Sequence, residues 1–302
     1  MTTERVTEDD NPVWVSLALA VVLTTTFFRV LVIVSSPLPL FFDEAQYWTW
    51  AQDLAFGYYS KPPMIAWAIA GTTALCGDGE ACVRLSAPLF HGGTSMVVFF
   101  LARALYDGRT GFWAAVSFAL LPGISLSGMI VSTDVYLLFF WALALLAIIR
   151  AEATNRWLWW GLFGGALGLG LLSKHAMVFF LLGFIVDSLW RRQDEPLWQR
   201  GRFWCAIGLA VVIYFPNLMW NWSLGFPSYL HTGENINING NLINPIKALE
   251  FLASQFGVFG PILLACYLGL IGMLLMRRSN GEVLTDRQRQ LFSYSLPILV
   301  LI

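Results

Sequence analysis

Long apolar runs separated by short polar segments make up most of this chain of 302 residues. A helix needs roughly 20 mainly apolar residues to cross a bilayer, and most of these runs approach that length. The pattern predicts spanning helices near residues 13–35, 84–105, 110–128, 134–151, 157–173, 175–190, 203–221 and 250–276, and a ninth that starts near Leu291. The ninth run stops after about 12 residues, which is too short for a span. We therefore expect residues 1–302 to be the N-terminal transmembrane module of a longer protein whose C-terminal part is missing.

Two features interrupt this alternation. The fifth and sixth runs would together make a helix too long for a membrane, so we expect a break near residues 172–175. The first outer segment, residues 36–83, is long for a connection without structure of its own. Its stretches 43–56 and 63–75 have apolar faces and predict two helices lying in the plane of the membrane interface.

Composition agrees with the hydropathy pattern. The chain is 57% hydrophobic and only 12% charged, and so much apolar surface does not fit into one soluble core. The predicted fold class is therefore an all-α, polytopic integral membrane protein with membrane lipids as partners. The net charge is −1 and the basic residues form short clusters between apolar runs, so no nucleic-acid partner is expected.

The charged residues predict how the chain is oriented. If the N-terminus is cytoplasmic, the arginines of the connecting segments all lie inside, as the positive-inside rule requires. These are Arg103, Arg109, Arg150, Arg156, Arg191, Arg192, Arg200, Arg202, Arg277, Arg278, Arg287 and Arg289. The same orientation places Lys61, Lys174 and Lys247 outside, together with several acidic residues. The outer face is therefore the candidate active face.

A pair of cysteines flanks a short polar turn in the first outer segment. Cys76 and Cys82 are six residues apart and would form a disulfide if the segment faces an oxidising compartment. Spacing alone does not decide between a disulfide and two free thiols.

The first outer segment also concentrates the candidate chemistry. Asp43 and Glu44 are adjacent carboxylates suited to general base catalysis, and Lys61 offers an ammonium group for a phosphate. Neighbours on a helix point about 100° apart, so only one of the two carboxylates can face a site, and either remains a candidate. Aromatic side chains such as Tyr47 and Tyr59 either stack on a sugar or form an interfacial belt.

Three further charged residues have both a functional and a structural interpretation. Arg29 lies inside the first apolar run, where a charge is either functional or extends to the interface. Asp134 either belongs to the site or caps the fourth predicted helix. Lys174, at the predicted helix break, is either a site residue or an interfacial anchor.

The segment 217–247 is polar and turn-rich after an aromatic start. Trp220 and Asn221 suit stacking on a sugar and hydrogen bonding to it, and an interfacial belt explains the tryptophan equally well. His231 is either a sugar or acceptor contact or a solvated loop residue. Ligation of a divalent metal by His231 or His175 is a further alternative.

Several of these positions occur in the order found in one known family. The motifs are Asp43-Glu44, Tyr59-x-Lys61-Pro62, Asp134 after the third predicted span and Leu172-Ser173-Lys174 after the fifth. Together with the hydropathy, they resemble membrane glycosyltransferases of the GT-C type, in the superfamily of protein O-mannosyltransferases and lipid A aminoarabinose transferases. The acidic pair at the end of the first span is the most specific of these signals.

The resemblance implies a GT-C-type helical bundle that takes a sugar from a polyprenyl-phosphate donor and transfers it to a lipid, glycan or protein acceptor. It implies that Asp43 is the base, Lys61 binds the lipid phosphate, Asp134 is a second acid and Lys174 an additional cation. It also implies an active site at the periplasmic face of a bacterial inner membrane. Ser60 stands where the aminoarabinose transferases carry a metal-binding glutamate, so the resemblance does not extend to a metal.

We therefore predict one site at the outer face, with single-displacement transfer and inversion at the sugar. The predicted catalytic residues are Asp43, Asp134 and Glu44; the donor phosphate ligands are Lys61, Lys174 and Arg29; the sugar or acceptor contacts are Tyr47, Tyr59, Trp220, Asn221 and His231. The alternative is a transporter or flippase of lipid-linked sugars. Such a protein would carry its polar residues at the bilayer midplane on interrupted, repeated helices, whereas here they crowd at one face.

Overall fold

The chain folds into a bundle of helices, and no strand occurs in the part that the structure describes. The computed structural model describes residues 11–190, 197–236, 245–279 and 285–301. The α-helices are α1 (Pro12–Ser35), α2 (Phe42–Ala51), α3 (Met64–Cys76), α4 (Glu80–Arg84), α5 (Ser86–Leu105), α6 (Gly108–Leu120), α7 (Pro122–Ser127), α8 (Thr133–Thr154), α9 (Trp157–Ser173), α10 (Val178–Trp190), α11 (Gly201–Ser223), α12 (Pro227–Ile236), α13 (Pro245–Phe259), α14 (Pro261–Ser279) and α15 (Asp286–Leu301). Short 3₁₀ turns occur at η1 (His175–Met177) and η2 (Leu197–Gln199).

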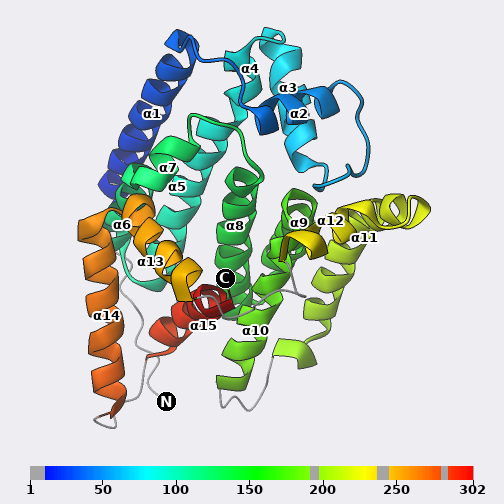
Figure 1. Cartoon of the computed structure of the whole chain (residues 1–302). Helices are drawn as coiled ribbons and strands as arrows, with labels where there is room; N and C mark the ends of the chain where they lie inside the picture. The colour runs from blue at the N-terminus through cyan, green and yellow to red at the C-terminus, as the bar shows by residue number, and fades with distance from the viewer. Residues whose placement is uncertain (1–10, 191–196, 237–244, 280–284, 302) are drawn as a thin grey trace.

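Most predicted spans are present as long helices that run alongside one another (Figure 1). Within the described residues, four helical stretches are long and apolar enough to cross a membrane: Pro12–Ser35, Glu80–Leu105, Thr133–Thr154 and Gly201–Ser223. The bent pair Leu249–Phe259 and Pro261–Met273 would be a fifth if its two parts form one span. Helix α8 lies between α5 and α9, and α9 packs in turn on α11. The prediction of an all-α integral membrane protein is confirmed.

Two predicted spans are broken, so the predictions of a single helix over residues 110–128 and of a single helix over residues 250–276 were wrong. The first is divided into α6 and α7 at Pro122, which has no N–H to continue the ladder and whose ring crowds the preceding turn. The second is divided into α13 and α14 before Pro261, where the two parts are bent by 116°. The predicted ninth helix begins at Asp286, earlier than expected.

The break expected near residues 172–175 is confirmed. Helix α9 ends at Ser173, Lys174 is extended with φ −158°, and the η1 turn follows before α10 begins. The consequence is that Lys174 and His175 project from a connection between two helices.

The first outer segment forms α2, α3 and α4 at one end of the bundle (Figure 1). Its two predicted helices are present, although α2 ends at Ala51, earlier than expected. Helix α12 was predicted as a loop and lies at the C-terminal end of α11. The ends of α5 and α8 and the starts of α6, α9 and α11, which carry many of the arginines, lie at the opposite end of the bundle (Figure 1). Arg191 and Arg192 of the predicted arginine pattern lie outside the described residues.

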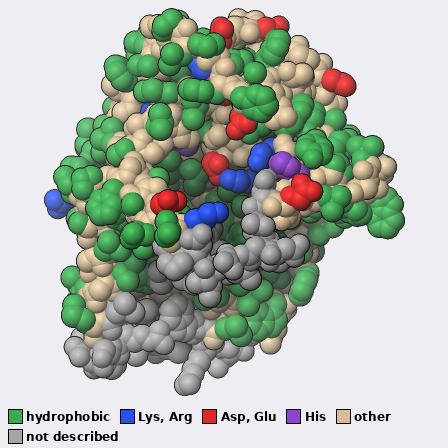
Figure 2. Space-filling model, viewed as in Figure 1, with side chains coloured by type: hydrophobic (Ala, Val, Ile, Leu, Met, Phe, Trp, Pro, Cys, Tyr) green, Lys and Arg blue, Asp and Glu red, His purple; other side chains and the backbone are tan. Residues whose placement is uncertain are grey.

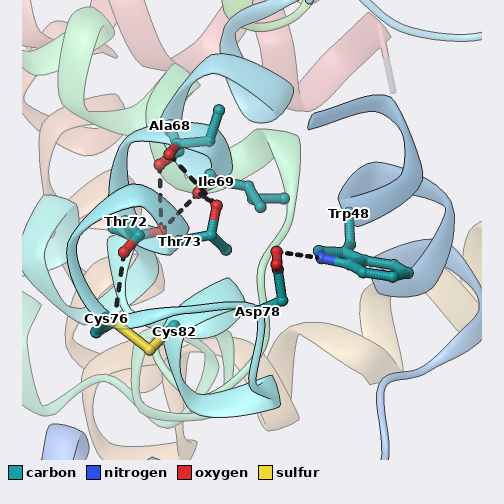
Figure 3. Close-up of a disulfide and its surroundings, with 9 residues drawn as sticks. Trp48, Ala68, Ile69, Thr72, Thr73, Cys76, Asp78 and Cys82 are labelled. Carbon is teal, nitrogen blue, oxygen red and sulfur yellow. Dashed lines mark hydrogen bonds between the residues drawn. A yellow bond between two sulfur atoms is a disulfide. The ribbon is translucent and has the colours of Figure 1, made fainter. Parts of the chain in front are cut away.

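Cys76 and Cys82 are joined by a disulfide that closes the turn between α3 and α4 (Figure 3). Within this turn, Asp78 accepts hydrogen bonds from the Trp48 indole nitrogen at 3.0 Å and from Gln52 at 3.3 Å. The turn therefore connects α2, through these hydrogen bonds, to the disulfide-bonded end of α3.

The disulfide predicts a definite number of reactive thiols. In the unfolded protein, a maleimide should label two thiols without reductant, Cys205 and Cys266, and four after reduction. The double variant Cys76→Ser/Cys82→Ser is the control, because its count should not change on reduction. Four reactive thiols in the unreduced wild-type protein would contradict the disulfide.

Candidate active site

Glu44 is buried in an ion pair that joins four segments of the chain. The Arg84 guanidinium donates to its carboxylate through Nε at 3.0 Å and through Nη2 at 2.7 Å. The backbone N–H groups of Phe41 and Val131 each donate to Glu44 at 3.0 Å. Arg84 also donates to the carbonyls of Leu38 and Pro39. Both oxygens of Glu44 are therefore occupied by structural partners.

Asp43 has the opposite environment. It lies in the first turn of α2 and is exposed, on the same helix face as Tyr47 four residues later. Burial, together with the negative charges of Asp43 and Asp134, raises the pKa of Tyr47 to about 12. The Val131 N–H bond to Glu44 likewise joins the start of α2, which carries Asp43, to the segment just before Asp134.

Asp134 contacts one of the predicted cations, Lys174. The Lys174 ammonium lies 2.6 Å from its carboxylate, and both side chains are partly open, at 35% and 53% exposure. The next residue, His175, is affected by the Lys61 charge: burial and Lys61 lower its pKa to about 4. Its ring is therefore neutral at physiological pH, and the charge of Lys61 acts on the residue that follows Lys174.

Figure 2 shows where charged side chains gather on one face of the molecule. Acidic, basic and histidine side chains gather near the middle of the face in view, below the end that carries α2–α4, while hydrophobic side chains surround them (Figures 1 and 2). A charged patch in such surroundings is a candidate site for a polar head group attached to a lipid.

The loop that carries Lys61 is held by buried polar side chains of α11 and α12. Asn217 donates to the Phe56 carbonyl at 2.6 Å, and the Ser228 hydroxyl donates to the Tyr58 carbonyl at 2.6 Å. Both Asn217 and Ser228 are fully buried. These bonds connect positions more than 150 residues apart in sequence and fix the loop backbone just before Lys61.

Two predicted sugar contacts belong to this loop anchor. Trp220 packs on Gly57 so closely that a Cβ there would lie 2.4 Å from the indole ring. Asn221 is fully buried, donates to the Asn217 carbonyl at 3.1 Å and accepts from the Ser228 N–H at 3.3 Å. Asn221 is therefore not on a surface that a sugar can touch in this structure, because its amide joins α11 to α12.

The remaining aromatic candidates lie beside Lys61. Tyr59 is exposed, and its ring centroid lies 5.3 Å from that of His231. The His175 ring stacks on Tyr229 at 4.7 Å between centroids, and Tyr214 reaches both of them with its hydroxyl group. Tyr59 and His231 therefore stay predicted as sugar or acceptor contacts.

Arg29 lies elsewhere in the bundle, against α6 and α7. Its side chain is buried and donates to the Ala119 carbonyl and, at 3.3 Å, to the Ser125 hydroxyl group. Ala119 is in the last turn of α6, where carbonyl groups lack helical partners and the helix dipole favours a cation. The structure thus gives Arg29 a role in closing the break between α6 and α7, which neither of the two sequence interpretations anticipated.

The structure therefore separates the predicted site residues into two groups. It brings together Asp43, Asp134, Lys61, Lys174 and Tyr47, with Tyr59 and His231 close to the Lys61 loop. It gives structural partners to Glu44, Arg29, Trp220 and Asn221. Sequence reasoning missed Arg84, Asn217 and Ser228, whose only signal is a polar side chain between apolar neighbours.

The described residues do not form a donor set for a metal ion. No three histidine, cysteine, aspartate or glutamate side chains among them lie close enough together to hold one. Ser60, at the position where the resemblance implies a glutamate ligand, is itself buried.

Comparison with known proteins shows the family of the chain. Residues 60–220 match the family model for dolichyl-phosphate-mannose-protein mannosyltransferase. The chain belongs to this family. The matched region includes Lys61, Asp134 and Lys174, and the resemblance drawn from the motifs is confirmed.

Two named relatives of this chain are sugar transferases. The chain is 35% identical over 288 residues to the lipid A galacturonosyltransferase RgtD of Rhizobium johnstonii. The aligned region covers 94% of this chain and 59% of that relative. The chain is 27% identical over 173 residues to the undecaprenyl phosphate-alpha-4-amino-4-deoxy-L-arabinose arabinosyl transferase of Pseudomonas paraeruginosa, covering 55% of this chain and 32% of that protein. The chain thus spans less than two thirds of the length of each of these relatives.

Solved structures confirm the fold of the family. ArnT from Cupriavidus metallidurans, bound to undecaprenyl phosphate, matches 96% of this chain and 55% of its own with a TM-score of 0.66 at 19% identity. The Pmt1–Pmt2 protein O-mannosyltransferase complex of S. cerevisiae, bound to the sugar donor, matches 72% of this chain and 32% of its own with a TM-score of 0.50 at 20% identity. The predicted GT-C-type helical bundle is therefore confirmed.

Proposed function

We propose that the protein is a glycosyltransferase that moves a sugar from a polyprenyl-phosphate donor to an acceptor hydroxyl group at the outer face of the membrane. The observation that carries the proposal is the convergence of Asp43, the Asp134–Lys174 pair and Lys61 at one end of a family fold. The names of the relatives favour a glycolipid such as lipid A as the acceptor, with a glycan or a protein as alternatives.

Asp43 acts as the general base in this proposal. It is exposed beside Tyr47, whereas both oxygens of the adjacent Glu44 are bonded to buried partners. The acceptor oxygen attacks the anomeric carbon, its proton passes to Asp43, and the bond from that carbon to the phosphate oxygen breaks. A single displacement of this kind inverts the configuration at the anomeric carbon.

The two lysines act on the departing phosphate. Lys61 stabilises the negative charge that develops on the phosphate oxygen as the bond to the sugar breaks. Lys174 supplies a second ammonium group, whose position is determined by its contact with Asp134 at 2.6 Å. An exposed ion pair contributes little to stability, so we assign this pair to orienting the ammonium group.

We also propose that this face is periplasmic and that the protein resides in a bacterial inner membrane. The disulfide in the α3–α4 turn supports an oxidising compartment at the site end. The arginine-bearing helix ends at the other end of the bundle support a cytoplasmic location there. The lipid A substrate in a relative's name agrees with both.

The proposal is tested by donor turnover. The purified full-length protein is incubated with a panel of polyprenyl-phosphate sugars, and release of polyprenyl phosphate is measured. Lys61→Ala should raise the KM for the donor by about 10- to 100-fold, since a hydrogen bond to a charged group is lost. Lys247→Ala, a change of the same kind on exposed α13, is the matched control and should behave as wild type. Equal kinetics for Lys61→Ala and wild type would contradict the phosphate contact, and no turnover with any donor would contradict the function.

A further inference from the structure

His175 is held in one orientation by two tyrosines. Its Nδ1 atom lies 3.1 Å from the Tyr214 hydroxyl oxygen, which in turn lies 2.5 Å from the hydroxyl oxygen of Tyr229. The Tyr229 ring also stacks on the imidazole, with an angle of 25° between the planes. One nitrogen and one face of the ring are therefore occupied by partners from α11 and α12.

The other ring nitrogen has no partner among the described residues. Nε2 of His175 is buried and makes no hydrogen bond in the part of the chain that the structure describes. A buried polar atom without a partner is destabilising, and such atoms in folded proteins usually indicate a bound water, an ion or a functional role. The two tyrosines that hold the ring and the break in the helix just before it maintain this costly arrangement.

The surroundings of the ring indicate what the missing partner is. Lys174 precedes His175 in the chain, and the charge of Lys61 reaches the imidazole. An acceptor atom near two ammonium groups is most stable when it carries negative charge. A neutral imidazole adds a directional N–H to these point charges, as in enzymes that use an uncharged histidine as a hydrogen-bond donor.

We propose that the Nε2–H group of His175 donates a hydrogen bond to an anionic oxygen of the bound donor, between the Lys61 and Lys174 ammonium groups. The proposal requires that the Tyr229 hydroxyl donates to Tyr214 and that Tyr214 donates to Nδ1, which places the ring proton on Nε2. This inference rests on the proposed function. The anionic oxygen belongs to the donor phosphate or to a carboxylate on the sugar, and the experiment separates these two sources.

The two nitrogens can be tested separately with two amide side chains. The amide of His175→Asn reaches the position of Nδ1, and the amide of His175→Gln reaches that of Nε2. Binding of undecaprenyl phosphate, and kcat and KM for a polyprenyl-phosphate uronic acid and for a polyprenyl-phosphate neutral sugar, are measured for the full-length wild type and both variants. Thermal unfolding in detergent shows whether each variant is folded.

We expect His175→Asn to weaken binding by about tenfold or more, with the effect on KM rather than on kcat, and His175→Gln to stay within about threefold of wild type. If undecaprenyl phosphate itself binds more weakly, the acceptor is the phosphate. If only the uronic acid donor is affected, the acceptor is the sugar carboxylate. Either result supports the proposal.

Two results would overturn it. If both variants bind and turn over every donor as wild type does, Nε2 has no role in binding. If donor binding is weakened by His175→Gln as much as by His175→Asn, or more, the ring acts only through its contact with Tyr214 and its packing. Both outcomes leave the proposed function standing, whereas a wild-type protein that neither binds nor turns over any donor overturns the function together with this inference.

Discussion

Asp43→Asn is expected to lower the rate of sugar transfer by about 10²- to 10⁴-fold, the usual contribution of a general base. Asparagine keeps the size of the side chain and cannot accept the acceptor's proton. Because Asp43 is exposed and takes no part in the Glu44–Arg84 contacts, the variant should fold and bind donor as wild type does. The measurements are kcat with donor and acceptor saturating, and binding of undecaprenyl phosphate.

The matched control is Asp53→Asn, the same change at an exposed aspartate just beyond α2. It should keep the wild-type kcat within about twofold, since small surface changes rarely matter. Turnover of Asp43→Asn near the wild-type value would remove Asp43 from the mechanism. Loss of donor binding together with turnover would instead show that Asp43 contributes to the shape of the site.

Arg84→Met is expected to lower the free energy of unfolding by about 3–5 kcal/mol, as is usual when one partner of a buried ion pair is removed. Glu44 would be left as a buried carboxylate, and the carbonyls of Leu38 and Pro39 would lose their donor. Because these contacts join the connection between α1 and α2, helix α2 and helix α4, the position of α2 should loosen as well. Unfolding in mixed detergent micelles, followed by far-UV circular dichroism, measures the effect.

Two further variants show whether the loss of stability comes from the uncompensated Glu44 charge or from any change of charge in this segment. Glu44→Gln/Arg84→Met removes the uncompensated charge and should recover part of the lost stability. Glu80→Gln changes an exposed carboxylate on the same short helix and should stay within about 0.5 kcal/mol of wild type. A wild-type unfolding free energy for Arg84→Met would show that the pair does not stabilise this end of the bundle.

The helices were largely predictable because a bilayer imposes a fixed length and an apolar surface on each span. Proline shows where this reasoning is insufficient. Pro122 ends α6, whereas Pro216 lies inside the continuous helix α11. The residue is the same in both places, and neighbouring helices decide whether the freed backbone groups find partners. The bend before Pro261 was missed for the same reason.

The acidic pair illustrates a similar limit at the site. Periodicity shows that Asp43 and Glu44 point in different directions, without showing which one faces the site. Arg84, 40 residues further along, decides it by binding Glu44. Likewise, the chain position of Arg29 suggested a phosphate ligand or an interfacial side chain, and only the packing of α6 against α1 brings Ala119 within its reach.

By itself, the sequence determined the membrane class, most of the spans and the concentration of lysines and acids on one face, because each of these follows from local length, polarity and charge. The tertiary structure alone decided which charged groups face one another and which are used inside the fold. Contacts such as Asp134–Lys174 and Asn217 with the Phe56 carbonyl join residues 40 and 161 positions apart. Such pairings depend on how helices pack, and no local pattern along the chain encodes them.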